Sequence, residues 1–511
     1  MRQHSATIRR GLAAALCLSL IAAACGSDDD DKAAETTAAA PTTAAGPATT
    51  TATAETTEAT TAETTEETTE ETTGDTTDET TEETTEETTE ATTEETTEDT
   101  ASDTTEAAGE TFQVPTDNCP ADATEPLADG EPIKLGFIGP QTGPLAAFGV
   151  IGQGMKVYFD KINTEDGGVD GHQLELVTKD DAYDPAKSAP AVQEALEGDN
   201  IFASVFQVGT PNVAGTRQLH ADACVPQALV GTGFPAWGDP ANFPWTSGGI
   251  PSYTVEAKVW VEFIKEKFPD AKKVAILSFN NDFGKTYKTT LGEALPEAGY
   301  EIVADVAHEA TSDLSNEVTQ LLAGGPDVII GGTTSTFCTS LITLARQGGF
   351  TGPIINSYTC QSIQQFMVPA GEAAANVFTL VVAKDPSDPS YADDEGVKQY
   401  LEDVATYGPG IDSKVGNVFT GYNAAFMVVD ALTRAAEMDG GLTRANLMNA
   451  FWSYDVVGPI AIGGISHVDG ITDAYISEFG VMAEYDPAGQ TYKVSDGVEI
   501  DVEGEGGVYS G

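Results

Sequence analysis

The sequence predicts an α/β fold with two lobes, each built on a doubly wound parallel β-sheet. From residue 131 onward, apolar runs of strand length alternate with segments of helical spacing, and this alternation predicts parallel strands joined by crossover helices. The cycle runs over 133–233 and again over 254–358. The globular part of the chain, from about residue 111 onward, has about 400 residues, which is more than one hydrophobic core usually serves, so we expect two lobes.

The first cycle begins with an apolar run, IKLGFIGP, that ends in Gly-Pro as a buried strand does. In the next segment Met155, Phe159 and Ile162 recur at helical spacing. Pro185 opens a later helix directly after Asp184, which we expect to cap it. The predicted strands are 133–140, 173–181, 201–209 and 227–233, and the predicted helices are 145–163, 185–199 and 211–223.

The second cycle repeats this order, and one of its helices is stopped by the Gly pair that follows LSNEVTQLLA. A further apolar segment, 418–438, has helical spacing and is placed to pack on the first lobe. The predicted strands are 273–280, 301–308, 327–333 and 352–358, and the predicted helices are 254–268, 285–299, 314–325 and 336–349.

Doubly wound sheets bind ligands outside the carboxyl ends of their strands. If two such sheets face each other, those ends line one shared cleft. The loops expected to line it are 139–149, 207–213, 231–238, 279–286, 332–337 and 356–362.

The N-terminus has the pattern of an export signal. Arg2, Arg9 and Arg10 precede an apolar stretch, 11–24, that is too short to span a bilayer. Small residues lead to Cys25, and this arrangement resembles a bacterial lipobox, although Ala22 stands where Leu is usual. The resemblance implies cleavage after residue 24 and a lipid on Cys25. The alternative is an ordinary signal peptide with a chance cysteine.

Residues 25–110 repeat Thr-Thr-Glu units and contain almost nothing apolar except Ala. Such a segment cannot offset the entropy cost of ordering, and its like charges repel one another. We therefore expect a disordered, solvated tether. Its carboxylates would bind divalent cations only diffusely.

The charge of the chain excludes several functions. The formal net charge is −57, and the globular part alone has well over twice as many acidic as basic residues. Phosphate binding needs clustered Lys and Arg, so nucleic acid is not an expected partner.

The sequence has no nucleophile elbow, dinucleotide fingerprint or metal motif, so neither an enzyme nor a cofactor is expected. The scattered His172, His220, His308 and His467 are interpreted as solvated surface groups.

Four cysteines remain once Cys17 and Cys25 are set aside: Cys119, Cys224, Cys338 and Cys360. An even number in an exported chain predicts two disulfides, with three possible connectivities. We favour Cys119–Cys224, which would fix the N-terminal extension to the core. The second favoured pair, Cys338–Cys360, closes a short loop within one βα unit.

Three motifs in this order resemble the type I periplasmic binding proteins of the leucine/isoleucine/valine class. They are GPQTGPLAAFG (139–149), the Asn-x-x-x-Gly-Gly-Val-x-Gly turn (163–171) and DDAYDP (180–185). The resemblance extends over 131–490. It implies two lobes joined by three crossings, with lobe closure around a ligand. The implied parts are an N-terminal extension 111–130, lobe 1 at 131–250 and 383–457, and lobe 2 at 251–382 and 458–511.

The resemblance also implies which residues contact the ligand. The loop after the third strand would contact a carboxylate, the loop after the fourth would add contacts, and two aromatic rings would close over the ligand. In the family, one position of the second lobe often holds Tyr, and in this sequence that position falls on one of two threonines. The residues so implied are Gly209 and Thr210, then Thr232, Gly233 and Phe234, then Phe148 and Phe283, and finally Thr333 or Thr334.

One position departs from the family pattern. The acid that often binds an α-amino group should lie in 356–361, but NSYTCQ contains no acid, and Tyr358 is the nearest candidate. The expected ligand is therefore a branched-chain or other amino acid, and the alternatives are a short amide, urea or an organic or aromatic acid.

The resemblance implies a monomeric receptor, anchored by lipid outside the cytoplasmic membrane, that delivers its ligand to ABC permease subunits. A surface sensor or interaction module on an acidic stalk is the alternative from another class.

Overall fold

The computed structural model describes residues 112–463, 466–502, 504 and 506–509. The expected signal peptide, Cys25 and the whole Thr/Glu-rich tether (25–110) lie outside the described residues. All of the elements below belong to one compact unit of the chain.

Lobe 1 is built on a parallel sheet with the strand order β2-β1-β3-β4-β5. Asp184 caps a helix of this lobe as expected, since its carboxylate accepts a hydrogen bond from the Ala186 amide. The strands are β1 (Ile133–Gly139), β2 (Leu174–Asp180), β3 (Ala203–Val205), β4 (Gln227–Val230) and β5 (Thr246–Gly248), and the helices are α1 (Ile151–Glu165), α2 (Pro185–Gln193), α3 (Thr210–Ala223), α8 (Glu395–Tyr407), α9 (Gly416–Glu437) and α10 (Arg444–Phe451).

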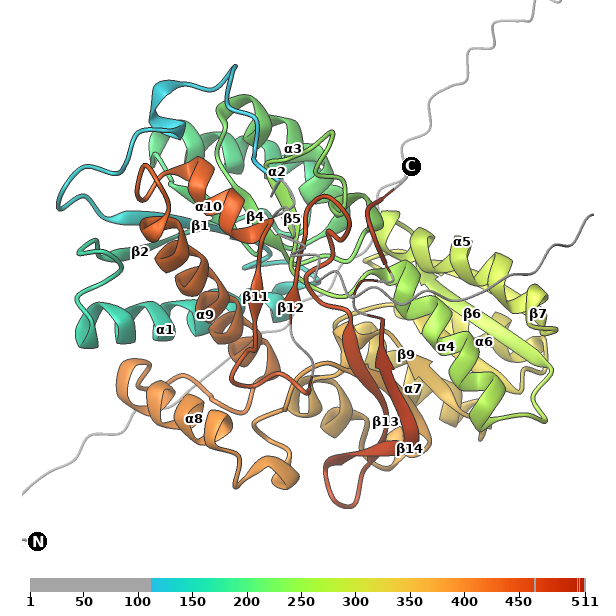
Figure 1. Ribbon diagram of the computed structural model, residues 1–511. Coiled ribbons are helices and arrows are strands. Elements are labelled where there is room, and N and C mark those ends of the chain that lie inside the picture. The colour runs from blue at the N-terminus through green and yellow to red at the C-terminus, as the bar shows by residue number, and fades with distance from the viewer. Residues whose placement is uncertain (1–111, 464–465, 503, 505, 510–511) are drawn as a thin grey trace, which may run out of the picture. The chain divides into compact units, whose positions relative to one another are not determined.

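Lobe 2 is built on a larger sheet with the order β14-β13-β10-β9-β8-β6-β7. Figure 1 shows it beside lobe 1, with α4 and α5 next to its β6–β7 edge. The strands are β6 (Lys273–Phe279), β7 (Glu301–His308), β8 (Val328–Gly332), β9 (Ile354–Asn356), β10 (Val377–Val381), β13 (Phe479–Asp486) and β14 (Thr491–Asp501), and the helices are α4 (Tyr253–Lys267), α5 (Asp282–Glu297), α6 (Ser315–Ala323) and α7 (Thr336–Gln347).

The lobe 2 sheet departs from the expected purely parallel pattern. Strands β13 and β14 form an antiparallel hairpin, and β13 pairs antiparallel with β10. The hairpin extends the parallel part of the sheet at its β10 edge. Strand β5 was also not among the predicted strands, and it ends just before the expected boundary between the lobes at residue 250.

Strands β3 and β4 are shorter than the sequence predicts, and each has a residue with positive φ at its end or within it. Phe206 directly follows β3 with φ 52°, and Leu229 lies inside β4 with φ 49°. Positive φ is unfavourable for these residue types and incompatible with regular strand geometry. Strand β3 therefore ends before the run 201–209 does, and the pairing of β4 with β5 is irregular between Gln227 and Val230.

The chain passes between the lobes three times. It leaves lobe 1 after β5, returns after β10 and leaves again after α10. The second and third crossings pair with each other: Ala383 and Ala461 form an antiparallel bridge, and the Ile462 amide donates to the Val382 carbonyl. A third short pair, β11 (Asp455–Val456) with β12 (Ser466–His467), lies next to these crossings in the sequence.

Helices α1 and α9 cross at close range within lobe 1. Gly154 of α1 faces the Val418 carbonyl, and Gly421 of α9 faces the Ile151 carbonyl, and a Cβ at either glycine would overlap the backbone of the other helix. Two glycines therefore allow the backbones to approach where larger side chains would separate them.

The structure contains the two disulfides that the sequence favours. Cys119 is bonded to Cys224 at the end of α3, and Cys338 to Cys360. The first bond joins the N-terminal extension to lobe 1, where Val114 also packs in the core and donates its amide to Asn449 Oδ1.

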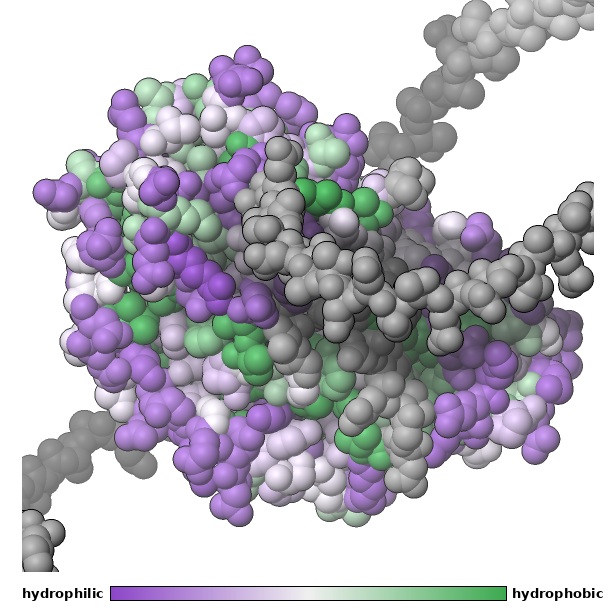
Figure 2. Space-filling view, viewed as in Figure 1, coloured by the Kyte–Doolittle hydropathy of each residue, from purple (hydrophilic) through white to green (hydrophobic). Residues whose placement is uncertain are grey.

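The face seen in Figure 2 is mainly hydrophilic over both lobes, with scattered apolar side chains between the polar ones. Among the described residues, none of the helices combines the length and the apolar character that a membrane crossing requires.

Candidate functional site

A cavity of about 720 Å³, measured with the space open to solvent, lies between the lobes. Each loop expected to line the cleft contributes to it. From lobe 1 come Leu145, Phe148, Val208, Gly209, Thr210 and Gly231, and from lobe 2 come Phe283, Thr334, Tyr358, Thr359, Gln361 and Ser362. The carboxyl ends of both sheets therefore face one cavity, as the doubly wound topology requires.

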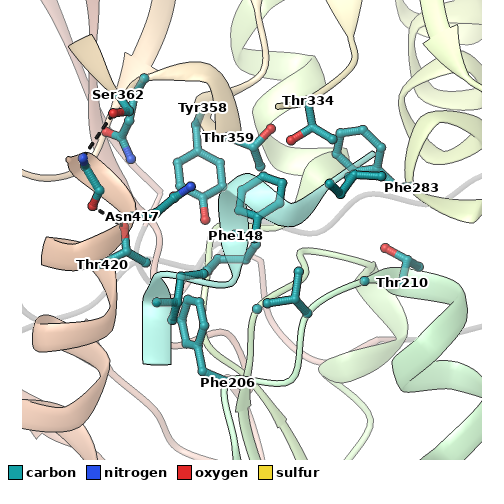
Figure 3. A pocket seen from close by; sticks show the side chains of 18 of the residues that line it. Phe148, Phe206, Thr210, Phe283, Thr334, Tyr358, Thr359, Ser362, Asn417 and Thr420 are labelled. Carbon is teal, nitrogen blue, oxygen red and sulfur yellow. Dashed lines mark hydrogen bonds between the residues drawn. The ribbon is translucent and has the colours of Figure 1, made fainter. Parts of the chain in front are cut away.

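Aromatic rings form much of the lining of this cavity. Figure 3 shows the rings of Phe148 and Tyr358 in the middle of the view, with Phe206 beneath them. Phe283 and Thr334 lie at one end, and Ser362, Asn417 and Thr420 lie at the other. The side chains come from segments that are far apart in the sequence, so the cavity forms only in the folded chain.

The backbone around the cavity is held in unusual conformations. Tyr183, Phe206 and Ser335 have φ values of 59°, 52° and 58°, and Tyr183 and Phe206 line the cavity. Such conformations cost of order 1–3 kcal/mol each and cluster at ligand sites in proteins. They aim the two rings into the space between the lobes.

The walls of the cavity are mostly apolar, and none of the described residues that line it is Asp, Glu, Lys, Arg or His. Burial raises the pKa of Tyr253 to about 12 and the pKa of Tyr358 well above its usual value, so these phenols stay neutral. The polar groups are hydroxyls and amides. Among these polar side chains, Thr334 differs from the others because its hydroxyl is buried without a hydrogen-bond partner.

Glu256 of α4 supports the wall from behind. Its carboxyl group accepts hydrogen bonds from the Tyr358 amide at 2.6 Å and from the Tyr287 hydroxyl at 2.5 Å. Full burial raises its pKa to about 8, so the group is mostly protonated near neutral pH. Glu256 therefore fixes the Tyr358 segment without placing a charge in the cavity lining.

The lobes touch at the edges of the cavity. The ring of Tyr183 in lobe 1 is stacked on Phe279 in lobe 2, with centroids 6.2 Å apart. Beside Phe148, the carbonyl of Ala147 in lobe 1 accepts a hydrogen bond from Gln365 Nε2 of lobe 2 at 3.2 Å, and a second one from Asn417 Nδ2 within lobe 1 at 2.8 Å. The structure is thus a state in which the lobes are in contact.

The structure brings together most of the residues that the sequence nominated. The nominated residues that line the cavity are Phe148, Gly209, Thr210, Phe283, Thr334 and Tyr358.

The other nominated residues stand behind this lining. Thr232 lies 2.5 Å from Thr210, hydroxyl to hydroxyl, and Gly233 accepts a hydrogen bond from the Tyr253 amide. Phe234 packs edge-on against Trp237. Thr232 and Gly233 therefore contact residues of the lining, whereas Phe234 contacts a residue that is not part of it.

Thr333 is paired with a histidine. Its hydroxyl lies 2.8 Å from His308 Nε2, and the His308 ring stacks on Phe279. The interpretation of the histidines as surface groups is wrong for His172, His220 and His308, which are buried. Burial lowers the pKa of His220 to about 4, so this residue stays neutral inside the lobe.

Sequence reasoning missed several lining residues. Tyr183 lies within the DDAYDP motif, which was interpreted through its aspartates, and Phe206 was assigned to a strand. Asn417, Phe419 and Thr420 come from the first turns of α9, where the apolar pattern indicated packing alone. Within the part of the chain that the structure describes, no cluster of His, Cys, Asp and Glu is arranged to hold a metal ion.

Residues 132–479 match the sequence profile of a family described as periplasmic binding protein. The leucine-, isoleucine-, valine-, threonine- and alanine-binding protein of Pseudomonas aeruginosa is 28% identical over 171 residues, which is 33% of this chain and 45% of that protein. A Leu/Ile/Val-binding protein of Rhizobium johnstonii is 29% identical over 217 residues, or 40% of this chain and 56% of that protein. The matches span about half the length of these relatives.

Solved structures share the fold. A fatty acid ABC transporter substrate-binding protein from Thermomonospora curvata superposes with a TM-score of 0.62 at 23% identity, covering 74% of this chain and 96% of that one. A branched-chain amino acid ABC transporter protein from Thermus thermophilus with bound valine gives 0.63 at 19% identity, covering 73% and 97%.

Proposed function

Because the chain belongs to the periplasmic binding protein family, in the type I group of the leucine/isoleucine/valine-binding proteins, we propose that it is an extracytoplasmic receptor for an ABC importer. It captures a small molecule between its lobes and delivers it to permease subunits. The observation that carries the proposal is the cavity, which takes its lining from the strand-end loops of both lobes.

The mechanism is binding followed by lobe closure. A ligand that contacts Phe148 and Thr210 in one lobe and Phe283 and Tyr358 in the other interacts fully only when the lobes meet. Its differential affinity shifts the population toward the closed state, which then docks on the permease. The paired crossings at Ala383 and Ala461 are placed to act as a hinge.

The localisation part of the proposal rests on the N-terminal sequence. Cleavage after residue 24 would leave Cys25 as the lipid-modified first residue, and the Thr/Glu-rich segment would act as a tether that holds the receptor near its permease. Mass spectrometry of the mature N-terminus tests this: a lipid-modified Cys25 supports the anchor, whereas an unmodified N-terminus at another position argues against it.

Ligand binding is tested by a thermal-shift screen of the full chain. We expect at least one small solute to raise the melting temperature, because a ligand that binds only the folded state stabilises it by about 2.7 kcal/mol at a hundredfold excess over Kd. The panel contains branched-chain and other amino acids, short amides, urea, fatty acids and aromatic acids, including the ligand classes named for the relatives. No shift with any of these would contradict the receptor function.

A further inference from the structure

A second cavity adjoins the one described above. It measures about 700 Å³ with the space open to solvent, and it shares Phe206, Ile250, Tyr358, Gln361, Phe419 and Thr420 with the first. Beyond these shared residues its walls are mainly apolar: Leu229, Pro251, Val382, Ala383, Ala424, Met427 and Ala461. We call the first cavity the head compartment and the second the tail compartment.

The two compartments adjoin each other and share six lining residues. They meet at the rings of Phe206, Tyr358 and Phe419, which line both. An elongated apolar molecule that reached past these rings would contact apolar side chains in both compartments.

The charges of the walls argue against a zwitterion. None of the described residues lining either compartment is charged, and the carboxyl group behind Tyr358, that of Glu256, already accepts hydrogen bonds from the Tyr287 hydroxyl and the Tyr358 amide. An ammonium group that leaves water without an anionic partner pays a large desolvation cost. The lining described here supplies no such partner.

The head compartment does supply hydrogen-bond donors for an acceptor group. Thr334 is 4% exposed and its hydroxyl has no hydrogen-bond partner, and Figure 3 shows this residue at the end of the cavity beside Phe283. Thr334 precedes Ser335, the N-cap residue of α7, and Thr210 is the first residue of α3. Neither N-cap residue, Ser335 or Gly209, caps its helix with a side chain. Helix N-termini favour a carboxylate and disfavour an ammonium group.

We propose that the ligand is a monocarboxylic acid with an extended hydrocarbon body, bound with its carboxylate at Thr334 and its tail between Phe206 and Phe419 in the tail compartment. This assignment rests on the proposed receptor function and names its substrate class. A zwitterionic amino acid is the ligand that it excludes.

The test measures binding of straight-chain carboxylates of increasing length to the full chain by calorimetry, with leucine alongside. Affinity is expected to rise about fourfold per methylene group, as burial of each CH₂ predicts, until the tail compartment is full. Thr334→Val, which keeps the shape and removes the hydroxyl, should weaken every member of the series about tenfold or more, and Thr334→Ser should restore binding.

A second variant separates the compartments. Ser477 is half-buried and lines only the tail compartment, so Ser477→Phe should weaken long acids at least tenfold and leave the shortest unchanged, with Ser477→Ala as its control. Asn423→Phe fills the same compartment from α9 and serves if the first variant does not fold. Tighter binding of leucine than of any acid, or affinity independent of chain length, overturns the assignment and leaves the receptor function intact. Binding of neither acids nor amino acids nor any other solute of the panel overturns the receptor function itself.

Discussion

Replacing Gly154 by Ala is expected to lower the free energy of unfolding by at least about 3 kcal/mol. A Cβ at this position would lie 1.7 Å from the Val418 carbonyl oxygen and 2.8 Å from the Tyr422 nitrogen, so it meets backbone that cannot rotate away. Helices α1 and α9 must separate, and the start of α9 carries Asn417 and Phe419 of the cavity. The variant should therefore lose ligand affinity as well as stability.

Gly292→Ala is the matched control for this experiment. Gly292 also lies inside a helix, α5, but a Cβ there has no neighbour within 4 Å. Ala is the better helix former, so this variant should be as stable as the wild type or more stable by up to about 1 kcal/mol. Urea unfolding followed by circular dichroism compares the two. Equal stability of both variants would show that the α1–α9 crossing is not as close as described.

Replacing Glu256 by Ala is expected to cost about 3 kcal/mol, because it leaves the buried Tyr358 amide without an acceptor and deprives the Tyr287 hydroxyl of one of its two partners. Glu256→Gln keeps an acceptor for the amide and should cost much less. Glu293→Gln, on the exposed face of α5, controls for the change of charge.

The same carboxyl group makes stability depend on pH. Its pKa is raised by burial from 4.5 to about 8, so between these values the folded state holds a proton that the unfolded state has released. Its contribution is fully present below about pH 4.5, falls as pH rises at up to about 1.4 kcal/mol per unit, and is lost above about pH 8. The wild type should therefore lose stability relative to Glu256→Gln across this window. Parallel curves for the two proteins would mean that Glu256 is ionised in the folded state.

Much of the fold could be predicted from local patterns. The alternation of strand-like and helix-like segments gave the parallel strands, the order of the helices and the loops that line the cavity. Local patterns failed where distant contacts determine the conformation. Phe206 and Leu229 adopt positive φ inside apolar runs, and no feature of the sequence marks them. The hairpin of β13 and β14 becomes a sheet edge only because β10 lies beside it.

The cavity was predictable in position but only partly in composition. Residues at strand ends, such as Phe283 and Tyr358, could be nominated because the topology brings those ends together. Phe419 and Thr420 could not, because a helix that packs on lobe 1 shows one apolar pattern whether or not its first turns line a cavity. The lack of charge in the lining follows from the whole set of residues and appears only in the folded structure.

The most direct test of the account is a measurement of lobe closure. A spectroscopic ruler between labels at Lys187 in lobe 1 and Lys285 in lobe 2, both exposed, reports their separation in the full chain. We expect a broad distribution of distances without ligand and a single narrow one once a ligand from the screen saturates the cavity. An unchanged distribution at saturation would contradict capture by closure of the two lobes.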